Sequence, residues 1–231
     1  MPASKRVGIV GVSAEGAALC YRTFCVEGAE LFGRHGHPEV SLHTYPLAEY
    51  MRHIEAGDWE SVGELMLRSA AALQRAGAEV LICPDNTAHQ AIDLIRESSP
   101  LPWLHIAEEV ATVAAQRGFR RLLVLGTRYL MESPVYPAKL APRGIASEVP
   151  PSEDRELINT IIFDELVCGR FEEPAREHLW RVIADGKRRG CDAVGLSCTE
   201  IPLLIGEADS PLPTLDSTRI LARAALREAV R

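Results

Sequence analysis

Three short segments of this chain recur in the same order about half a chain length later. The pairs are residues 6–11 with 121–126, 77–86 with 190–199 and 100–105 with 211–216, at offsets of 115, 113 and 111 positions. Each match is weak by itself, because an apolar run followed by a glycine is common. Their order and nearly constant offset indicate a duplicated half, and so long a period predicts two similar domains rather than a solenoid.

Each half alternates apolar strands, turns and helical patterns, as α/β folds do. The apolar run 7–10 ends at Gly11 and is followed by a helical pattern. Further strands are expected at 39–45 and 78–83, with a long helix between them that Asp58 caps. The sequence therefore predicts an α/β protein in which parallel strands alternate with helices.

The duplication sets the expected domain organisation. We expect two pseudo-symmetric lobes, each a mostly parallel sheet flanked by helices, with the active site in the cleft between them. The first lobe is expected to comprise residues 1–105 plus 208–231, and the second residues 106–207.

Composition excludes several classes of function. The 231 residues are 47% apolar and carry a net charge of -7, so the chain has no basic surface for nucleic acid. No apolar run reaches transmembrane length and no secretory signal precedes the first strand, so we expect no membrane partner and a cytoplasmic location. The six cysteines are expected to be reduced, and their spacing matches no structural zinc site, so we expect no metal.

Cys198 follows the apolar strand 193–196, and Glu200 and Pro202 open a turn or helix after it. In open α/β sheets, ligands bind at the carboxyl ends of the strands. A helix that begins beside a thiol also lowers its pKa and favours the reactive thiolate. The alternative interpretation is a small buried apolar residue, which free cysteine usually is.

The repeat pairs Cys198 with Asp85, since 113 positions separate them. If the lobes face each other, a thiol and a carboxylate flank one bound molecule. Two such groups can remove a proton from one face of a carbon and return it from the other, which is racemisation, epimerisation or a related isomerisation. The alternative role of Asp85 is structural, because Pro-Asp-Asn is a strong turn sequence.

Polar residues occupy the matching strand ends. The amide, hydroxyl and backbone N–H groups of Asn86, Thr87, Thr127 and Thr199 can hold a carboxylate and an enolate-like oxygen. Asn86 and Thr87 can equally cap the following helix. The turn after Gly11, which contains Ser13, is a further place for a substrate carboxylate at a helix N-terminus.

Two motifs in these segments resemble those of the aspartate/glutamate racemases. The family's Cys-Asn-Thr-x-His corresponds to Asp85–His89, and its Gly-Cys-Thr-Glu-Ile-Pro-Leu-Leu corresponds to Ser197–Leu204. The resemblance extends over essentially the whole chain. It implies two α/β lobes, no cofactor, a substrate-facing acid/base at Cys198 and a homodimer.

The chain departs from the family pattern at sites that bear on the reaction. Asp85 stands where most members have the first catalytic cysteine, and Cys83 is not expected to replace it. Leu130 stands where the family usually has threonine, near the expected substrate pocket. These departures favour a less polar or larger carboxylate than aspartate or glutamate.

The resemblance implies a cofactor-independent amino-acid racemase or epimerase in which Cys198 and Asp85 exchange the α-proton from opposite faces. Candidate substrate-binding residues are Ser13, Asn86, Thr87, Thr127, Leu130 and Thr199. Two alternatives stay open. One is a single-cysteine decarboxylase or isomerase of a small carboxylic acid, similar to arylmalonate decarboxylase, and the other is a non-catalytic carboxylate binder.

Overall fold

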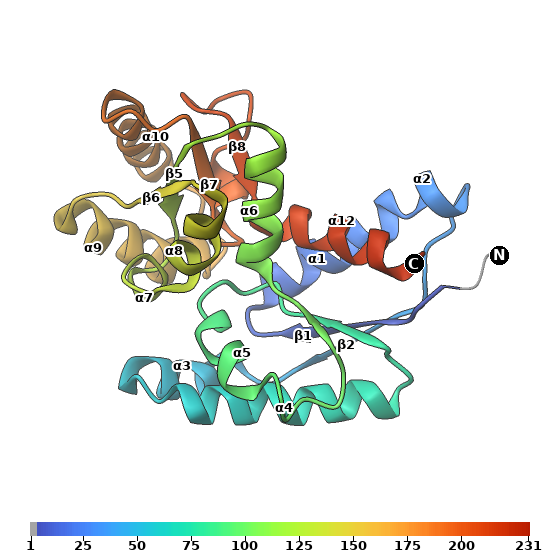
Figure 1. Ribbon diagram of the computed structural model, residues 1–231. Helices are drawn as coiled ribbons and strands as arrows, with labels where there is room; N and C mark the ends of the chain where they lie inside the picture. Colours follow the sequence, from blue (N-terminus) through green and yellow to red (C-terminus); the bar gives the residue numbers. More distant parts are fainter. Residues whose placement is uncertain (1–3) are drawn as a thin grey trace. The chain divides into compact units, whose positions relative to one another are not determined.

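A computed structural model describes residues 4–231, so residues 1–3 of the expected first lobe lie outside the described part. The chain divides into two compact units (Figure 1). The first unit contains residues 4–106 and Thr218–Arg231, and the second contains Ala107–Ser217. Residues 208–217, expected in the first lobe, therefore group with the second unit, because strand β8 (Thr214–Asp216) pairs with a strand there.

The first unit is built on a four-stranded parallel sheet with the order β2-β1-β3-β4. Its strands are β1 (Val7–Gly11), β2 (Val40–Thr44), β3 (Val80–Ile82) and β4 (Trp103–Leu104). Its helices are α1 (Ala14–Glu27), α2 (Ala29–Phe32), α3 (Leu47–Ala56), α4 (Trp59–Arg75), α5 (His89–Ile95) and α12 (Ser217–Ala229), whose first residue lies in the second unit. Helices cover both faces of this sheet (Figure 1).

The second unit repeats the arrangement with the parallel order β6-β5-β7-β8. Its other strands are β5 (Arg121–Leu125), β6 (Ala146–Glu148) and β7 (Ala193–Leu196). Its α-helices are α6 (Ile106–Gln116), α7 (Arg128–Met131), α8 (Val135–Leu140), α9 (Ser152–Thr160), α10 (Glu173–Arg188) and α11 (Ile201–Leu204). The first residue of α6 lies in the first unit. A 3₁₀ turn at Ala141–Arg143 and a π-helix at Ile161–Leu166 complete the second unit.

The sequence repeat is a repeat of structure. Its three segment pairs contain β1 and β5, β3 and β7, and β4 and β8, and each pair holds the same position in its own sheet. The predicted α/β class and the two parallel sheets are confirmed.

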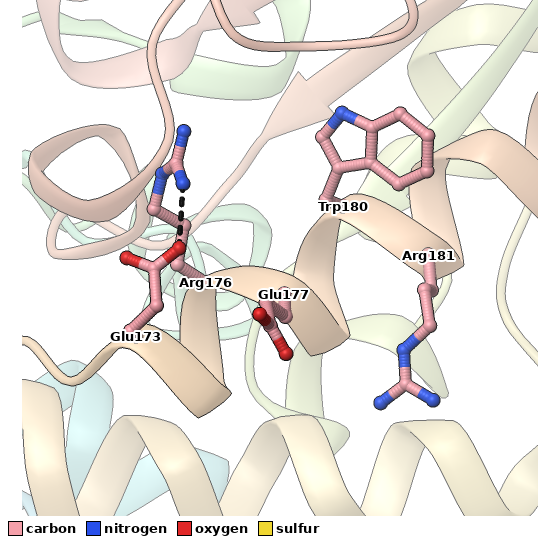
Figure 2. Close-up of a pocket in the computed structure, with 5 residues that line it drawn as sticks. All are labelled: Glu173, Arg176, Glu177, Trp180 and Arg181. Carbon is pink, nitrogen blue, oxygen red and sulfur yellow. Dashed lines mark hydrogen bonds and ion pairs between the residues drawn. The ribbon is translucent and has the colours of Figure 1, made fainter.

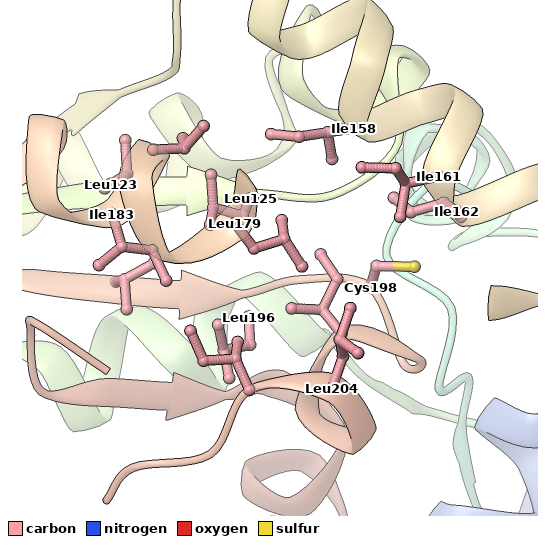
Figure 3. Close-up of a cluster of buried hydrophobic side chains, with 14 of the residues drawn as sticks. Leu123, Leu125, Ile158, Ile161, Ile162, Leu179, Ile183, Leu196, Cys198 and Leu204 are labelled. Carbon is pink, nitrogen blue, oxygen red and sulfur yellow. The ribbon is translucent and has the colours of Figure 1, made fainter. Parts of the chain in front are cut away.

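Burial explains why the central strands β1 and β7 are apolar along their whole length. All five residues of β1 and all four of β7 are buried, because helices cover both faces of a parallel sheet. In the first unit, Phe24 of α1 and Leu221 of α12 pack against β1 and β3. In the second unit, side chains of β5, β7, α9 and α10 form one cluster (Figure 3).

Helix α4 shows how local sequence sets the limits of an element. The Oδ1 of Asp58 accepts a hydrogen bond from the backbone N–H of Ser61 at 3.1 Å, so the predicted N-cap is confirmed. At the other end, Gly77 has a φ of 92°, which glycine adopts without strain. Among residues 4–231, no helix has both the length and the apolar character needed to cross a bilayer.

Candidate active site

Cys198 lies two residues beyond the end of β7, at the carboxyl end of the second sheet. Its side chain is 7% exposed and belongs to the cluster that contains Ile162, Leu196 and Leu204 (Figure 3). Its Sγ donates a hydrogen bond to Oε2 of Glu200 at 3.0 Å. The thiol therefore combines a largely apolar setting with one carboxyl oxygen as its acceptor.

The helix expected after Cys198 is a single turn, Ile201–Leu204. Glu200 precedes this turn and makes no side-chain cap bond to it. So short a helix has little dipole, so it gives no support to the expectation that a helix N-terminus lowers the thiol pKa. The thiol instead lies against a carboxylate, which the sequence reasoning treated only as part of a turn.

Asp85 holds the corresponding place in the first sheet, after β3, and is half-buried. Its Oδ1 accepts a hydrogen bond from the backbone N–H of Ala88 at 2.8 Å. Its backbone carbonyl accepts a second bond, from Nδ1 of His89 at 2.7 Å. The turn role weighed from the sequence is therefore present, and an N–H donated to a carboxylate also stabilises its ionised form.

His89 is a structural residue of this turn. The ring is 1% exposed, and its Nε2 accepts a hydrogen bond from the backbone N–H of Ile106 at 3.1 Å. Because Nε2 accepts, Nδ1 carries the proton that is donated to the Asp85 carbonyl. The ring also packs edge-on against His105, with ring centroids 4.6 Å apart. Both ring nitrogens therefore have backbone partners, which makes His89 a packing and capping residue.

Cys83 and Tyr50 are completely buried near Asp85. Burial, with a smaller contribution from the charge of Asp85, raises the pKa of the Cys83 thiol well above its ordinary value. The pKa of Tyr50 is raised by burial in the same way. Cys83 therefore stays a neutral thiol at neutral pH, as expected of a residue that does not replace the missing catalytic cysteine.

Ser13 and Thr127 occupy equivalent positions in the two units, each two residues after a strand. The hydroxyl oxygen of Ser13 accepts from the N–H of Gly16, and that of Thr127 accepts from the N–H of Leu130, both at 3.2 Å. Both residues are N-caps, of α1 and α7 respectively. Their fixed hydroxyls lie at the carboxyl ends of the central strands, where the sequence predicted substrate contacts.

Leu130 packs over the end of β5. A Cβ atom at Gly126 would lie 2.8 Å from Cδ2 of Leu130 and 2.9 Å from the carbonyl oxygen of Ser197, so only glycine fits there. Leu130 is 2% exposed and thus places an apolar side chain beside the strand that leads to Cys198.

The predicted site residues form one group in each unit. Ser13, Asp85, Asn86 and Thr87 follow strands of the first sheet, and Asn86 and Thr87 are buried. Thr127, Leu130, Cys198 and Thr199 follow strands of the second sheet. Glu200 is the residue that sequence reasoning missed. The sequence signal that could have identified Glu200 is its position in the motif Ser197–Leu204, which resembles that of the racemases.

A separate surface cavity of about 400 Å³ lies on α10 (Figure 2). Its lining residues are Glu173, Arg176, Glu177, Trp180 and Arg181. Arg176 pairs with Glu173 at 2.8 Å, and the indole of Trp180 is exposed. None of the predicted site residues lines this cavity. Within residues 4–231, no group of three or more His, Cys, Asp or Glu side chains has an arrangement that could hold a metal ion.

Comparison with known proteins identifies a family. The family model described as Asp/Glu/Hydantoin racemase matches residues 7–225. The broad specificity amino-acid racemase RacX of Bacillus subtilis is 23% identical over 193 residues, covering 81% of this chain and 80% of that protein.

Solved structures of proteins described as racemases or their homologues are also similar to this chain. A candidate Asp/Glu racemase from Yersinia pestis is 34% identical with a TM-score of 0.89, covering 98% of this chain and 100% of that one. An aspartate racemase homologue from Pyrococcus horikoshii is 30% identical with a TM-score of 0.84 and the same coverage. These comparisons favour an amino-acid isomerase over the decarboxylase alternative.

Proposed function

Because this chain belongs to the Asp/Glu/Hydantoin racemase family, we propose that it is an amino-acid racemase or epimerase in which Cys198 and Asp85 exchange the α-proton from opposite faces of the substrate. The observation that carries this proposal is the equivalence of the two residues. Each follows the strand at the same position in its own sheet, β3 for Asp85 and β7 for Cys198.

The hydrogen bonds of the two groups suggest complementary starting states. Asp85 accepts a backbone N–H, which favours a carboxylate ready to take a proton. Cys198 donates its S–H to Glu200, so it is a thiol ready to give one. We propose that Asp85 removes the α-proton and Cys198 returns a proton to the other face. The same groups with exchanged protons perform the reverse reaction.

The proposed substrate is an amino acid that is not restricted to aspartate and glutamate. The buried Leu130 supplies an apolar contact at the end of β5. The similarity to a racemase named for broad specificity supports the same expectation. The proposal includes catalysis without pyridoxal phosphate by a homodimer, which rests on the family resemblance. It also includes a cytoplasmic location and no metal, which rest on the sequence.

The test is solvent exchange at the α-carbon. Free amino acids are incubated with the protein in deuterated water, and loss of the α-proton signal is followed by proton NMR together with chiral chromatography. We expect exchange and racemisation of at least one amino acid, and a loss of about 10²-fold or more in Cys198→Ala, since a positioned acid/base contributes that much. Full turnover by Cys198→Ala with the true substrate would refute the assignment.

A further inference from the structure

The outward face of α10 carries an exposed indole at the middle of the helix. Trp180 is the central residue of this sixteen-residue helix and is 46% exposed (Figure 2). Other side chains of α10, among them Leu179 and Ile183, pack into the core of the second unit. Tryptophan is mostly buried in folded proteins and is enriched at interfaces between them. The position of Trp180 therefore favours contact with a partner.

The exposed charges on the two sides of Trp180 have opposite signs. Toward the N-terminus lie the acids Glu172, Glu173 and Glu177, and toward the C-terminus lie the bases Arg181, Lys187 and Arg188. Each half holds one residue of the other sign, which already has a partner: Arg176 pairs with Glu173 and Asp185 pairs with Arg188, both at 2.8 Å. Neither Glu177 nor Arg181 forms an ion pair with another of residues 4–231. The helix therefore presents an acidic half and a basic half around one aromatic residue.

A surface of this kind is complementary to a second copy of itself. When two identical helices lie antiparallel about a two-fold axis, a residue of one copy faces a different residue of the other, and the same contact occurs twice. With the axis at Trp180, Glu173 lies at the height of Lys187 of the second copy. Glu177 lies within two residues of the height of Arg181, which is about 3 Å along a helix. The two indoles meet at the axis. A parallel pair would instead bring like charges together.

We infer that the outward face of α10 is the surface through which two copies of this chain associate. The helices lie antiparallel, with Trp180 at the centre and ion pairs between Glu177 of each copy and Arg181 of the other. The homodimer itself is part of the proposed function, whereas the choice of this surface rests on the exposure and the charges of α10. None of the predicted site residues belongs to this helix, so substitutions on its outward face leave the candidate site unaltered.

The experiment is sedimentation equilibrium over a wide range of protein concentrations, which gives the dissociation constant of the dimer. Trp180→Ala removes the central contact, and Arg181→Glu places an acid against Glu177 at two points of each dimer. Each variant should raise the Kd about tenfold or more, as expected for residues at the centre of an interface. High salt should also raise the Kd of the wild-type protein, because it screens the ion pairs.

Two further variants sharpen the test. Glu177→Arg combined with Arg181→Glu restores opposite charges across the axis with their signs exchanged, so the Kd should return toward the wild-type value. Arg22→Glu reverses an exposed charge on α1, in the first unit, and should leave the Kd unchanged. Because all the substituted side chains are exposed, each variant should keep the wild-type fold, which circular dichroism checks.

The outcomes separate this inference from the proposed function. A Kd that rises in Trp180→Ala and Arg181→Glu and recovers in the double variant supports the inference. A double variant that associates as weakly as Arg181→Glu overturns the antiparallel pairing. A dimer with the same Kd in all variants overturns the inference and leaves the homodimer in place on another surface. A monomeric wild type overturns both and leaves α10 to a different protein. Racemase activity is judged separately, by α-proton exchange.

Discussion

Asp85 has two possible roles, and two substitutions separate them. Its Oδ1 caps the turn before α5 by accepting the N–H of Ala88 at 2.8 Å. Asp85→Asn keeps an oxygen acceptor at that position but cannot take up a proton as a carboxylate does. Asp85→Ala removes both. The asparagine variant therefore tests the chemistry with the turn preserved.

The structure sets the expected magnitudes. Losing a capping side chain costs ~1 kcal/mol, so Asp85→Ala should lower the free energy of unfolding by that amount. For a chain of this length, this corresponds to a fall of roughly 2–4 °C in the unfolding midpoint. Asp85→Asn should change the midpoint by less than about 1 °C, since only a few tenths of a kcal/mol are involved. Both variants should lose about 10²–10⁴-fold in racemisation rate, the contribution of a positioned acid/base.

Asp58→Ala is the matched control, because Asp58 caps α4 through the same kind of bond, to Ser61 at 3.1 Å. It should lose similar stability and keep full activity. The assays are thermal unfolding by circular dichroism and racemisation by chiral chromatography. If Asp85→Asn retained wild-type activity, Asp85 would be a turn residue alone and the two-base mechanism would be refuted.

Two further predictions concern buried groups of the first unit. His89→Ala removes the side-chain partner of the Asp85 carbonyl and of the Ile106 N–H. The two lost hydrogen bonds, together with the cavity, should lower the free energy of unfolding by about 3–5 kcal/mol. A decrease below ~1 kcal/mol in urea unfolding would contradict this account. The pKa of the Cys83 thiol is raised by burial. The contribution of this neutral thiol to the free energy of unfolding is therefore complete below pH ~8.5, where the unfolded thiol begins to ionise, and is lost as the pH rises further. Iodoacetamide should therefore leave Cys83 unmodified at pH 7.5 while it labels the exposed Cys168, and equal labelling of both would show that Cys83 is accessible.

Local sequence predicted the strands and their ends well. The apolar runs at β1, β5 and β7 are continuous because both faces of a parallel sheet are buried, and this pattern needs no knowledge of neighbours in space. The cap at Asp58 was equally predictable, since its partner is three residues away.

The boundary near residue 208 was harder to place. Nothing local shows that β8 pairs with β7, and this pairing puts residues 208–217 in the second unit. The turn or helix expected after Cys198 is present as a single helical turn that ends at Leu204, and its length could not be read from Glu200 and Pro202.

The sequence by itself determined the α/β class, the duplication and the two strand ends where Asp85 and Cys198 stand, because periodicity, glycine turns and motifs are local properties. Only the tertiary structure decided what surrounds those side chains. Spacing places Glu200 two residues from Cys198, but it does not show that the carboxylate turns back to Sγ with one oxygen buried and without a hydrogen-bond partner among the described residues. That arrangement depends on packing around the end of β7, which is a property of the folded unit.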